Sequence, residues 1–102
     1  VVHDNTVYTA GQVALEAPGT DAAEQTRNIL SRIDALLSEA GTDKSQVISA
    51  TIWLSDMDTF NEMNGIWDAW VTPGATPARA CVEAKLAAPQ FTVEMAVIAA
   101  LD

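Results

Sequence analysis

Cysteine, histidine and basic residues are scarce in this chain of 102 residues. It has one cysteine, Cys81, and one histidine, His3, and only 5 lysines and arginines against 14 acidic residues. A single cysteine cannot form an internal disulfide, which fits a reducing compartment, and we predict a cytoplasmic protein. Without a Cys/His cluster, and with scattered acids, the sequence predicts no metal site. It also has no glycine-rich phosphate loop.

The excess of acids gives a formal net charge of -9. Such a charge repels phosphate backbones and anionic lipids, so we predict neither a nucleic-acid partner nor a membrane partner. No apolar run approaches the roughly 20 residues that a spanning helix needs, and no signal peptide is recognisable.

The length fits one domain, residues 1–102, and is too short for two. A chain of this size buries only about 60–70% of its unfolded surface, so oligomerisation is a natural source of extra stability. Because the sequence begins at Val1 and not at methionine, we expect a further segment upstream.

The first half predicts a hairpin, a loop and a helix. β-rich residues 1–3 and 6–13 flank Asp4-Asn5, a pair that tolerates a positive φ. Residues 14–20 predict a loop, and Asp21 followed by Glu24 predicts a helix start. Gly41 predicts its end. The helical stripe consists of Ala22, Thr26, Ile29, Leu30, Ile33, Leu36, Leu37 and Ala40.

The second half predicts a strand over 47–55, a helix, a break over 72–77 and two more strands over 78–85 and 91–101. Ile48, Ala50, Ile52 and Leu54 are expected to form the apolar face of the first of these strands. Asp56 or Asp58 is expected to cap the helix, whose stripe is Phe60, Met63, Trp67, Trp70 and Val71. The order ββαβαββ predicts an α+β fold with two helices packed on one face of a sheet.

The last strand is apolar on both faces. Val93, Met95 and Val97 alternate with Ala96 and Ile98. A sheet with one solvated face should alternate apolar with polar residues. Two helices cover one face only, so other subunits are the candidates to cover the second face.

Two charged residues, Arg79 and Glu94, interrupt these apolar strands. A charge removed from water is costly unless it is paired. One interpretation is structural: the two residues pair with each other, or lie near strand ends in solvent. The other is a binding site, in which a guanidinium binds a carboxylate through two hydrogen bonds and a nearby carboxylate deprotonates water. The pattern alone does not favour either.

Cys81 shares a strand face with Arg79 and Glu83. A nucleophilic role needs a partner base or a depressed pKa, and His3 lies in a different hairpin. We therefore expect Cys81 to be a small buried side chain beside the site. The three tryptophans are expected in the core or an interface.

Four segments together resemble one known family. Residues 7–13 (VYTAGQV) resemble its opening strand, and Gln25-Thr26 with Ile33-Asp34 and residues 37–41 resemble its first helix. Leu54-Ser55-Asp56 with Phe60 and Met63-Asn64 resembles its strand-to-helix segment. Residues 77–83 (PARACVE) with Val93-Glu94-Met95 resemble the C-terminal signature of the RidA (YjgF/UK114) family, and the match runs through the whole chain.

The resemblance implies a chorismate-mutase-like fold and a homotrimer with sites between subunits. It also implies a 2-iminobutanoate/2-iminopropanoate deaminase that hydrolyses enamines and imines to 2-keto acids and ammonia without a cofactor. By the same resemblance, Arg79 grips the substrate carboxylate and the backbone of Cys81 binds substrate or water. Glu94 activates the water, while Asn64 and the backbone at Gly11 line the pocket.

The sequence departs from the family at Ala10, where many members have serine, and we expect the short segment that members carry ahead of the first strand to lie before Val1; both bear on substrate preference. The rival hypothesis is a non-catalytic trimer that binds small carboxylates and regulates partner proteins. Ribonuclease activity, ascribed to some relatives, is disfavoured by the charge and by the lack of a basic patch.

Overall fold

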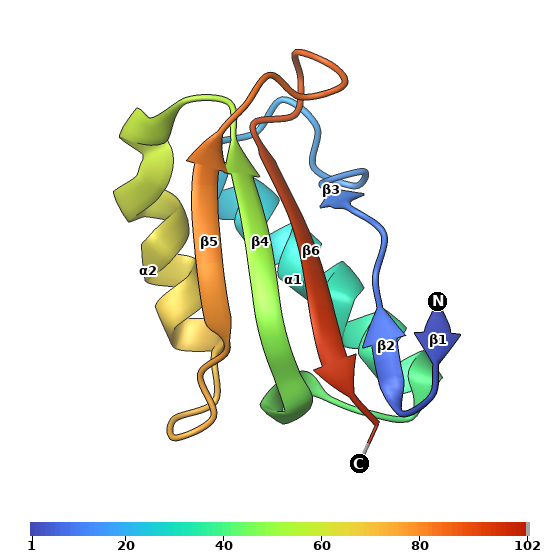
Figure 1. Cartoon of the computed structure of the whole chain (residues 1–102). Coiled ribbons are helices and arrows are strands. Elements are labelled where there is room, and N and C mark those ends of the chain that lie inside the picture. Colours follow the sequence, from blue (N-terminus) through green and yellow to red (C-terminus); the bar gives the residue numbers. More distant parts are fainter. Residues whose placement is uncertain (102) are drawn as a thin grey trace.

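A computed structural model describes residues 1–101 as an α+β domain (Figure 1). Its elements are β1 (Val2–His3), β2 (Thr6–Tyr8), β3 (Gln12–Val13), α1 (Ala22–Ala40), η1 (Lys44–Gln46), β4 (Val47–Leu54), η2 (Met57–Thr59), α2 (Phe60–Trp70), β5 (Ala78–Glu83) and β6 (Val93–Ala100). The two η elements are single turns of 3₁₀ helix. Within the described part of the chain, no helix has the length and apolar character needed to cross a membrane.

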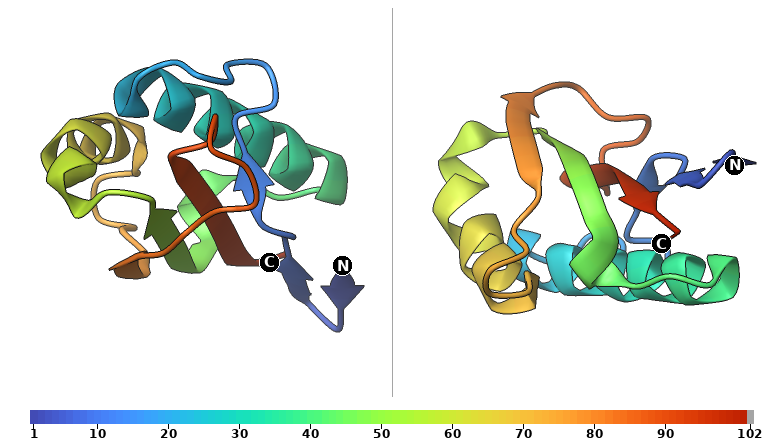
Figure 2. Two further views of the ribbon diagram at one scale, coloured as in Figure 1. Left: turned by 90° about the horizontal axis from the view of Figure 1, so that it is seen from above. Right: turned by 60° about the horizontal axis from the view of Figure 1, so that its bottom comes forward.

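All six strands form one mixed sheet in the order β1-β2-β6-β4-β5, and β3 also pairs with β6. β4 and β5 run parallel and are joined through α2, whereas the remaining pairs are antiparallel. Both helices lie on the same side of the sheet (Figure 2). The predicted α+β architecture with two helices on one face is therefore confirmed.

The ends of α1 follow from its sequence as predicted. The Asp21 side chain accepts a hydrogen bond from the Glu24 backbone N–H at 2.8 Å, which satisfies one of the amides that a helix start leaves unpaired. Gly41 closes the helix in the left-handed region, with φ 92°, where a glycine has no Cβ to strain.

The core lies between the helices and the sheet. The residues of β4 and β6 that face the helices are Ala50, Ile52, Leu54, Val93, Met95, Val97 and Ala99, all buried. Against them pack Ile29, Leu30, Ile33 and Leu37 of α1 and Met63, Trp67 and Trp70 of α2. Burying such side chains stabilises a domain by about 1.5–3 kcal/mol each.

The predicted apolar face of β4 is wrong at one position. Ile48 is 53% exposed, whereas Val47 and Ala50 are buried. The register passes from Val47 opposite Ala99 to Ser49 opposite Ile98, so Ile48 is an extra residue in a β-bulge. The bulge shifts the alternation by one residue and turns Ile48 outward.

The predicted strand over 6–13 is interrupted. The hydroxyl of Thr9 accepts a hydrogen bond from the Val97 N–H at 3.0 Å, and its own N–H donates to the Val97 carbonyl at 3.0 Å. The Thr9 side chain thus takes a backbone position in the ladder, and the strand resumes as β3 at Gln12. β5 ends two residues earlier than predicted, at Glu83, and β6 begins two residues later than predicted, at Val93.

The start of the second helical segment resolves the choice between two caps. Asp56 accepts a hydrogen bond from the Asp58 N–H at 2.9 Å and so caps η2. α2 follows directly, with Thr59 in the cap position but without a capping side-chain hydrogen bond.

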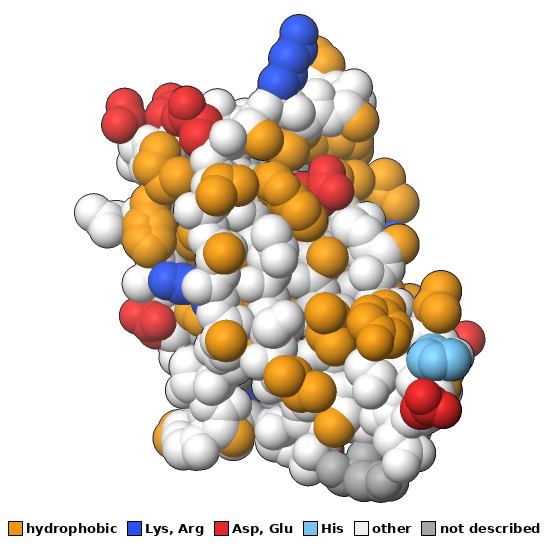
Figure 3. Space-filling view, in the orientation of Figure 1, with side chains coloured by type: hydrophobic (Ala, Val, Ile, Leu, Met, Phe, Trp, Pro, Cys, Tyr) orange, Lys and Arg blue, Asp and Glu red, His pale blue; other side chains and the backbone are white. Residues whose placement is uncertain are grey.

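Among the described residues, no helix lies over the second face of the sheet (Figure 1), which is the face that Figure 3 shows. By strand alternation it presents small, apolar and hydroxyl side chains. They are Thr6, Tyr8, Ser49, Thr51, Trp53, Ala78, Ala80, Val82, Ala96, Ile98 and Ala100. Glu94 is the one charged residue that the described strands β2, β4, β5 and β6 place on this open face.

Candidate functional site

Arg79, the second residue of β5, is held against α2 by three side chains. Its Nη1 donates a hydrogen bond to Asn64 Oδ1 at 2.6 Å. Its Cζ lies 5.4 Å from the ring centroid of Phe60 and 5.5 Å from that of Trp67. These are cation–π distances. The guanidinium therefore rests on an aromatic shelf, formed by Phe60 and Trp67, while the residue itself remains exposed.

The amide that contacts Arg79 is itself oriented. Asn64 Nδ2 donates to Asp68 Oδ2 at 3.3 Å, one helical turn further along α2. With the amide nitrogen directed to a carboxylate, the amide oxygen faces Arg79. Among residues 1–101, no carboxylate lies within ion-pair distance of the Arg79 guanidinium. Its positive charge is thus held by neutral partners.

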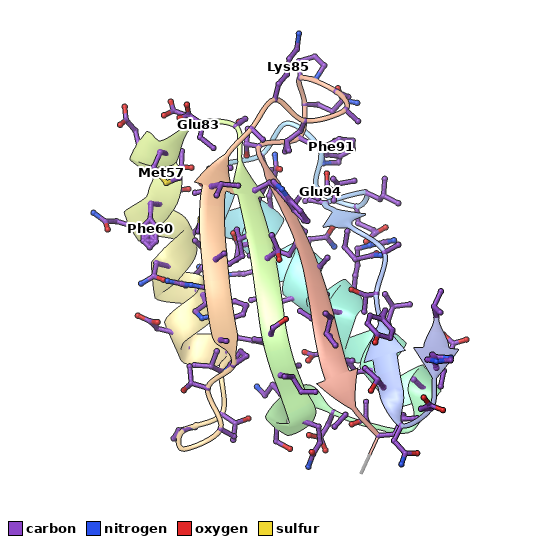
Figure 4. All side chains as sticks on the ribbon, in the orientation of Figure 1. Met57, Phe60, Glu83, Lys85, Phe91 and Glu94 are labelled. Atoms are coloured by element: carbon purple, nitrogen blue, oxygen red, sulfur yellow. The ribbon has the colours of Figure 1, made fainter. Side chains whose placement is uncertain are left out.

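Cys81 lies two residues further along the same face of β5 and packs against the core. Burial raises the pKa of the Cys81 thiol, and the opposing effect of the Arg79 charge is smaller. The thiol is therefore mostly protonated near neutral pH, which argues against the nucleophile alternative. The third residue on this face, Glu83, accepts a hydrogen bond from the Met57 N–H at 2.8 Å (Figure 4).

Glu94 lies on β6 with its carboxylate against the backbone of Gly11. A Cβ added at Gly11 would stand 3.1 Å from the Cδ of Glu94 and closer still to Oε2. Gly11 lies between β2 and β3, which both pair with β6. A larger residue here would make the Glu94 side chain shift, whereas the φ of Gly11 is not in the left-handed region and sets no demand for glycine.

The predicted site residues lie in two separate groups. Arg79, Asn64 and Cys81 gather on the helix-bearing side, whereas Glu94 and Gly11 meet where the open face borders β3. β4 separates the groups, with Ala50 in register with Arg79 and Trp53 with Glu94. The Arg79–Glu94 pair that the structural interpretation allowed is therefore not formed within one chain. Each residue is the second of its strand and so lies near a strand end, but only Arg79 is exposed, whereas Glu94 is half-buried.

One groove of the single chain lies away from Arg79 and Glu94. A groove of about 700 Å³ at the end of β5 is lined by Ser55, Glu83, Phe91 and the 84–89 loop. Neither Arg79 nor Glu94 is among the described residues that line it. Size alone would favour this groove, but we give more weight to the oriented charges, because recognition of a small polar ligand depends on them.

Sequence reasoning missed the aromatic shelf, although the signal was present. Phe60, Asn64 and Trp67 recur at steps of four and three on α2, which places them on one face of the helix. The contact between Gly11 and Glu94 carried no such local signal. The described residues hold no group of three or more His, Cys, Asp or Glu side chains that would bind a metal ion.

Comparison with known proteins identifies the class. A family model described as Endoribonuclease L-PSP matches residues 1–101. The RutC family protein YoaB of Escherichia coli is 45% identical over 101 residues, which are 99% of this chain and 87% of that protein.

Solved structures agree with this class. NMB1025 of Neisseria meningitidis, described as a member of the YjgF protein family, is 48% identical with a TM-score of 0.92, over 96% of this chain and 81% of that one. A Pseudomonas aeruginosa protein is 44% identical with a TM-score of 0.95, over 99% and 87% of the two chains. The chain belongs to the YjgF (RidA) family, which confirms the resemblance seen in its sequence.

Proposed function

We propose that this protein hydrolyses reactive enamines and imines of the 2-aminoacrylate type to 2-keto acids and ammonia. The observation that carries the proposal is the Arg79 guanidinium, which is oriented by Asn64 and two aromatic rings and has no carboxylate partner among the described residues. A planar guanidinium matches a carboxylate with two parallel hydrogen bonds. A 2-imino acid supplies that carboxylate directly beside the carbon that water must attack.

Glu94 supplies the acid–base function in this proposal. Water adds to the carbon of the protonated imine while Glu94 takes one proton of the water, which gives a neutral carbinolamine. Glu94 then gives that proton to nitrogen and accepts the hydroxyl proton as the C–N bond breaks and C=O forms, which leaves a 2-keto acid, ammonia and the proton that the imine carried. Positioned proton transfer of this kind contributes about 10²–10⁴-fold to a rate. No cofactor is required, because the imine is already an electrophile.

We further propose that the active unit is a homotrimer with sites between subunits. Arg79 and Glu94 lie on opposite sides of one sheet, so a site that uses both needs two copies of the chain. The uncharged residues of the open face offer a surface on which a second copy can pack. Light scattering is expected to give three times the chain mass, and a stable monomer at micromolar concentration would contradict the assembly.

A non-catalytic trimer that binds small carboxylates is the second candidate, since Arg79 would serve it equally well. Glu94 favours hydrolysis, because a carboxylate near the ligand does not help to bind an anion. The test couples an amino-acid dehydratase to this protein and follows imine decay for wild type, Glu94→Gln and a control, Glu39→Gln, which removes the same charge from the surface of α1.

We expect Glu94→Gln to lose hydrolysis by about 10²–10⁴-fold while keeping 2-ketobutyrate binding, and Glu39→Gln to match wild type. If wild type leaves imine decay unchanged but binds 2-ketobutyrate through Arg79, the protein is a sensor and the hydrolase proposal is wrong.

We do not extend to this chain the ribonuclease activity in the family description. Of its basic side chains, Arg27 and Arg32 are paired with carboxylates, and Lys44 lies over the Trp70 ring. Arg79 and Lys85 alone form no basic patch, and phosphate backbones are bound by clustered cations.

A further inference from the structure

Side chains tie the segment around Gly11 to helix α1. Arg32 Nη1 donates to Glu16 Oε2 at 2.8 Å, and its Nε donates to Gln12 Oε1 at 3.3 Å. The same Gln12 amide donates from Nε2 to the Ala10 carbonyl at 3.0 Å. The Arg32 guanidinium therefore contacts the Gln12 side chain directly and is linked to the Ala10 carbonyl through the Gln12 amide. Gln12 and Ala10 are the two neighbours of Gly11.

A second pair of hydrogen bonds fixes the anchor of this network. Asn28 Nδ2 donates to Glu16 Oε1 at 3.0 Å, and the Glu16 N–H donates back to Asn28 Oδ1 at 3.3 Å. The hydrogen bonds from Asn28 and then Arg32 lower the pKa of the Glu16 carboxyl, so Glu16 is ionised at neutral pH. The Arg32 side chain is thus held by Glu16 and Gln12 and is only 30% exposed.

The position of this network matters because Gly11 lies in a break of the pairing with β6. Thr9 hydrogen-bonds Val97 before the break, and β3 (Gln12–Val13) resumes the pairing after it. Within the break, the backbone at Gly11 lies against the Glu94 carboxylate. A shift of the 10–12 backbone would therefore change the space available to that carboxylate.

We propose that Arg32, acting through Gln12, is a positioning residue that keeps the Gly11 backbone against Glu94 and so fixes the direction of the Glu94 carboxylate. The inference rests on the proposed function for its catalytic consequence, because a carboxylate that turns away from the attacking water is a poorer base. Arg32 itself touches neither substrate nor the reacting atoms.

The chain offers a matched control on the same helix. Arg27 pairs with Glu24, three residues away on α1, and among the described residues it makes no hydrogen bond or ion pair with the 10–16 segment. Arg32→Met and Arg27→Met each remove one cation and keep an apolar stem, so the net charge changes equally. Steady-state imine hydrolysis is measured for both, together with thermal unfolding.

We expect Arg32→Met to lower kcat about tenfold with KM within about twofold, because misplacing a catalytic group by an ångström costs up to about 10²-fold. Arg27→Met should keep both constants within about twofold. Arg32→Lys, which retains the charge opposite Glu16 but loses the forked contact to Gln12, should fall between wild type and Arg32→Met. Equal kcat for Arg32→Met and Arg27→Met would overturn the inference.

Amide hydrogen exchange over residues 10–13 separates this inference from the proposed function. In Arg32→Met the exchange there should be at least about threefold faster than in Arg27→Met, while β4 stays unchanged. If wild type hydrolyses no imine but this difference appears, the hydrolase proposal fails and the positioning of Gly11 stands. If exchange over residues 10–13 is the same in both variants, the positioning role is wrong whatever the activity.

Discussion

Replacing Arg79 by lysine tests the carboxylate-binding role while keeping the positive charge. The guanidinium meets three partners at once, namely Asn64 Oδ1 at 2.6 Å and the Phe60 and Trp67 rings at 5.4 and 5.5 Å. A lysine ammonium is a compact point charge that cannot lie flat on both rings and present two parallel N–H groups to a carboxylate. Arg79→Lys therefore loses the fork and part of the shelf contact.

The size of the loss follows from these contacts. One hydrogen bond to a charged group contributes about 1.5–3 kcal/mol. The contact with the shelf is made within the chain whether or not ligand is bound, so it does not add to the affinity. Since about 1.4 kcal/mol is a factor of ten, we expect affinity for a 2-keto acid to fall about 10- to 140-fold. Little stability should be lost, because Arg79 is exposed.

Calorimetric titration with 2-ketobutyrate measures this affinity, and kcat/KM for imine hydrolysis should fall by a similar factor. Arg27→Lys is the control for the same chemical change away from the site. Asn64→Asp is a second probe: its carboxylate would pair with Arg79 and compete with the ligand, so binding should weaken although no cation is removed. Affinity within about threefold of wild type in Arg79→Lys, with the shelf intact, would refute the forked clamp.

Three further predictions concern other parts of the chain. Cys81→Ser should keep substantial activity, and alkylation of the Cys81 thiol should be slow at pH 7 and accelerate as the pH rises, because burial raises its pKa; a covalent substrate adduct on Cys81 in mass spectrometry would contradict this. Gly11→Ala should lower kcat with little change in melting temperature, because the added Cβ collides with the Glu94 carboxylate; normal turnover would show that the contact is dispensable. Gln25→Leu should destabilise the fold by about 2–4 kcal/mol in denaturant unfolding, since this fully buried amide hydrogen-bonds the backbone of Thr20, Gln90 and Thr92; an unchanged midpoint would be the contrary result.

Features set by near neighbours in the sequence were predictable. Asp21 and Gly41 bound α1 because capping depends on three or four adjacent residues. The turn at Asp4, with φ 54°, follows from the tolerance of Asp and Asn for the left-handed region. The two-sided apolar pattern of β6 likewise indicated that the helices cover one face of the sheet. That other subunits cover the second face stays a prediction.

Features that depend on pairing between distant segments were not predictable. The bulge at Ile48 is a property of the register between β4 and β6, and alternation along β4 alone cannot reveal it. The interruption at Thr9 depends on its hydroxyl reaching Val97. For the site, the residue types indicated Arg79 and Glu94, but their relative placement required the strand order, which puts β4 between them.

The choice of partners around Arg79 supports the proposed binding role over a structural one. An arginine that serves stability alone is most simply satisfied by a carboxylate of the same chain. Here Glu94 faces away, Glu83 is engaged by the Met57 N–H, and Asp68 contacts the Asn64 amide at 3.3 Å. The guanidinium is instead held by a neutral amide and two rings, which fix its orientation without neutralising its charge. An arginine arranged in this way retains its attraction for an incoming carboxylate, and a carboxylate is the group that every 2-imino acid brings.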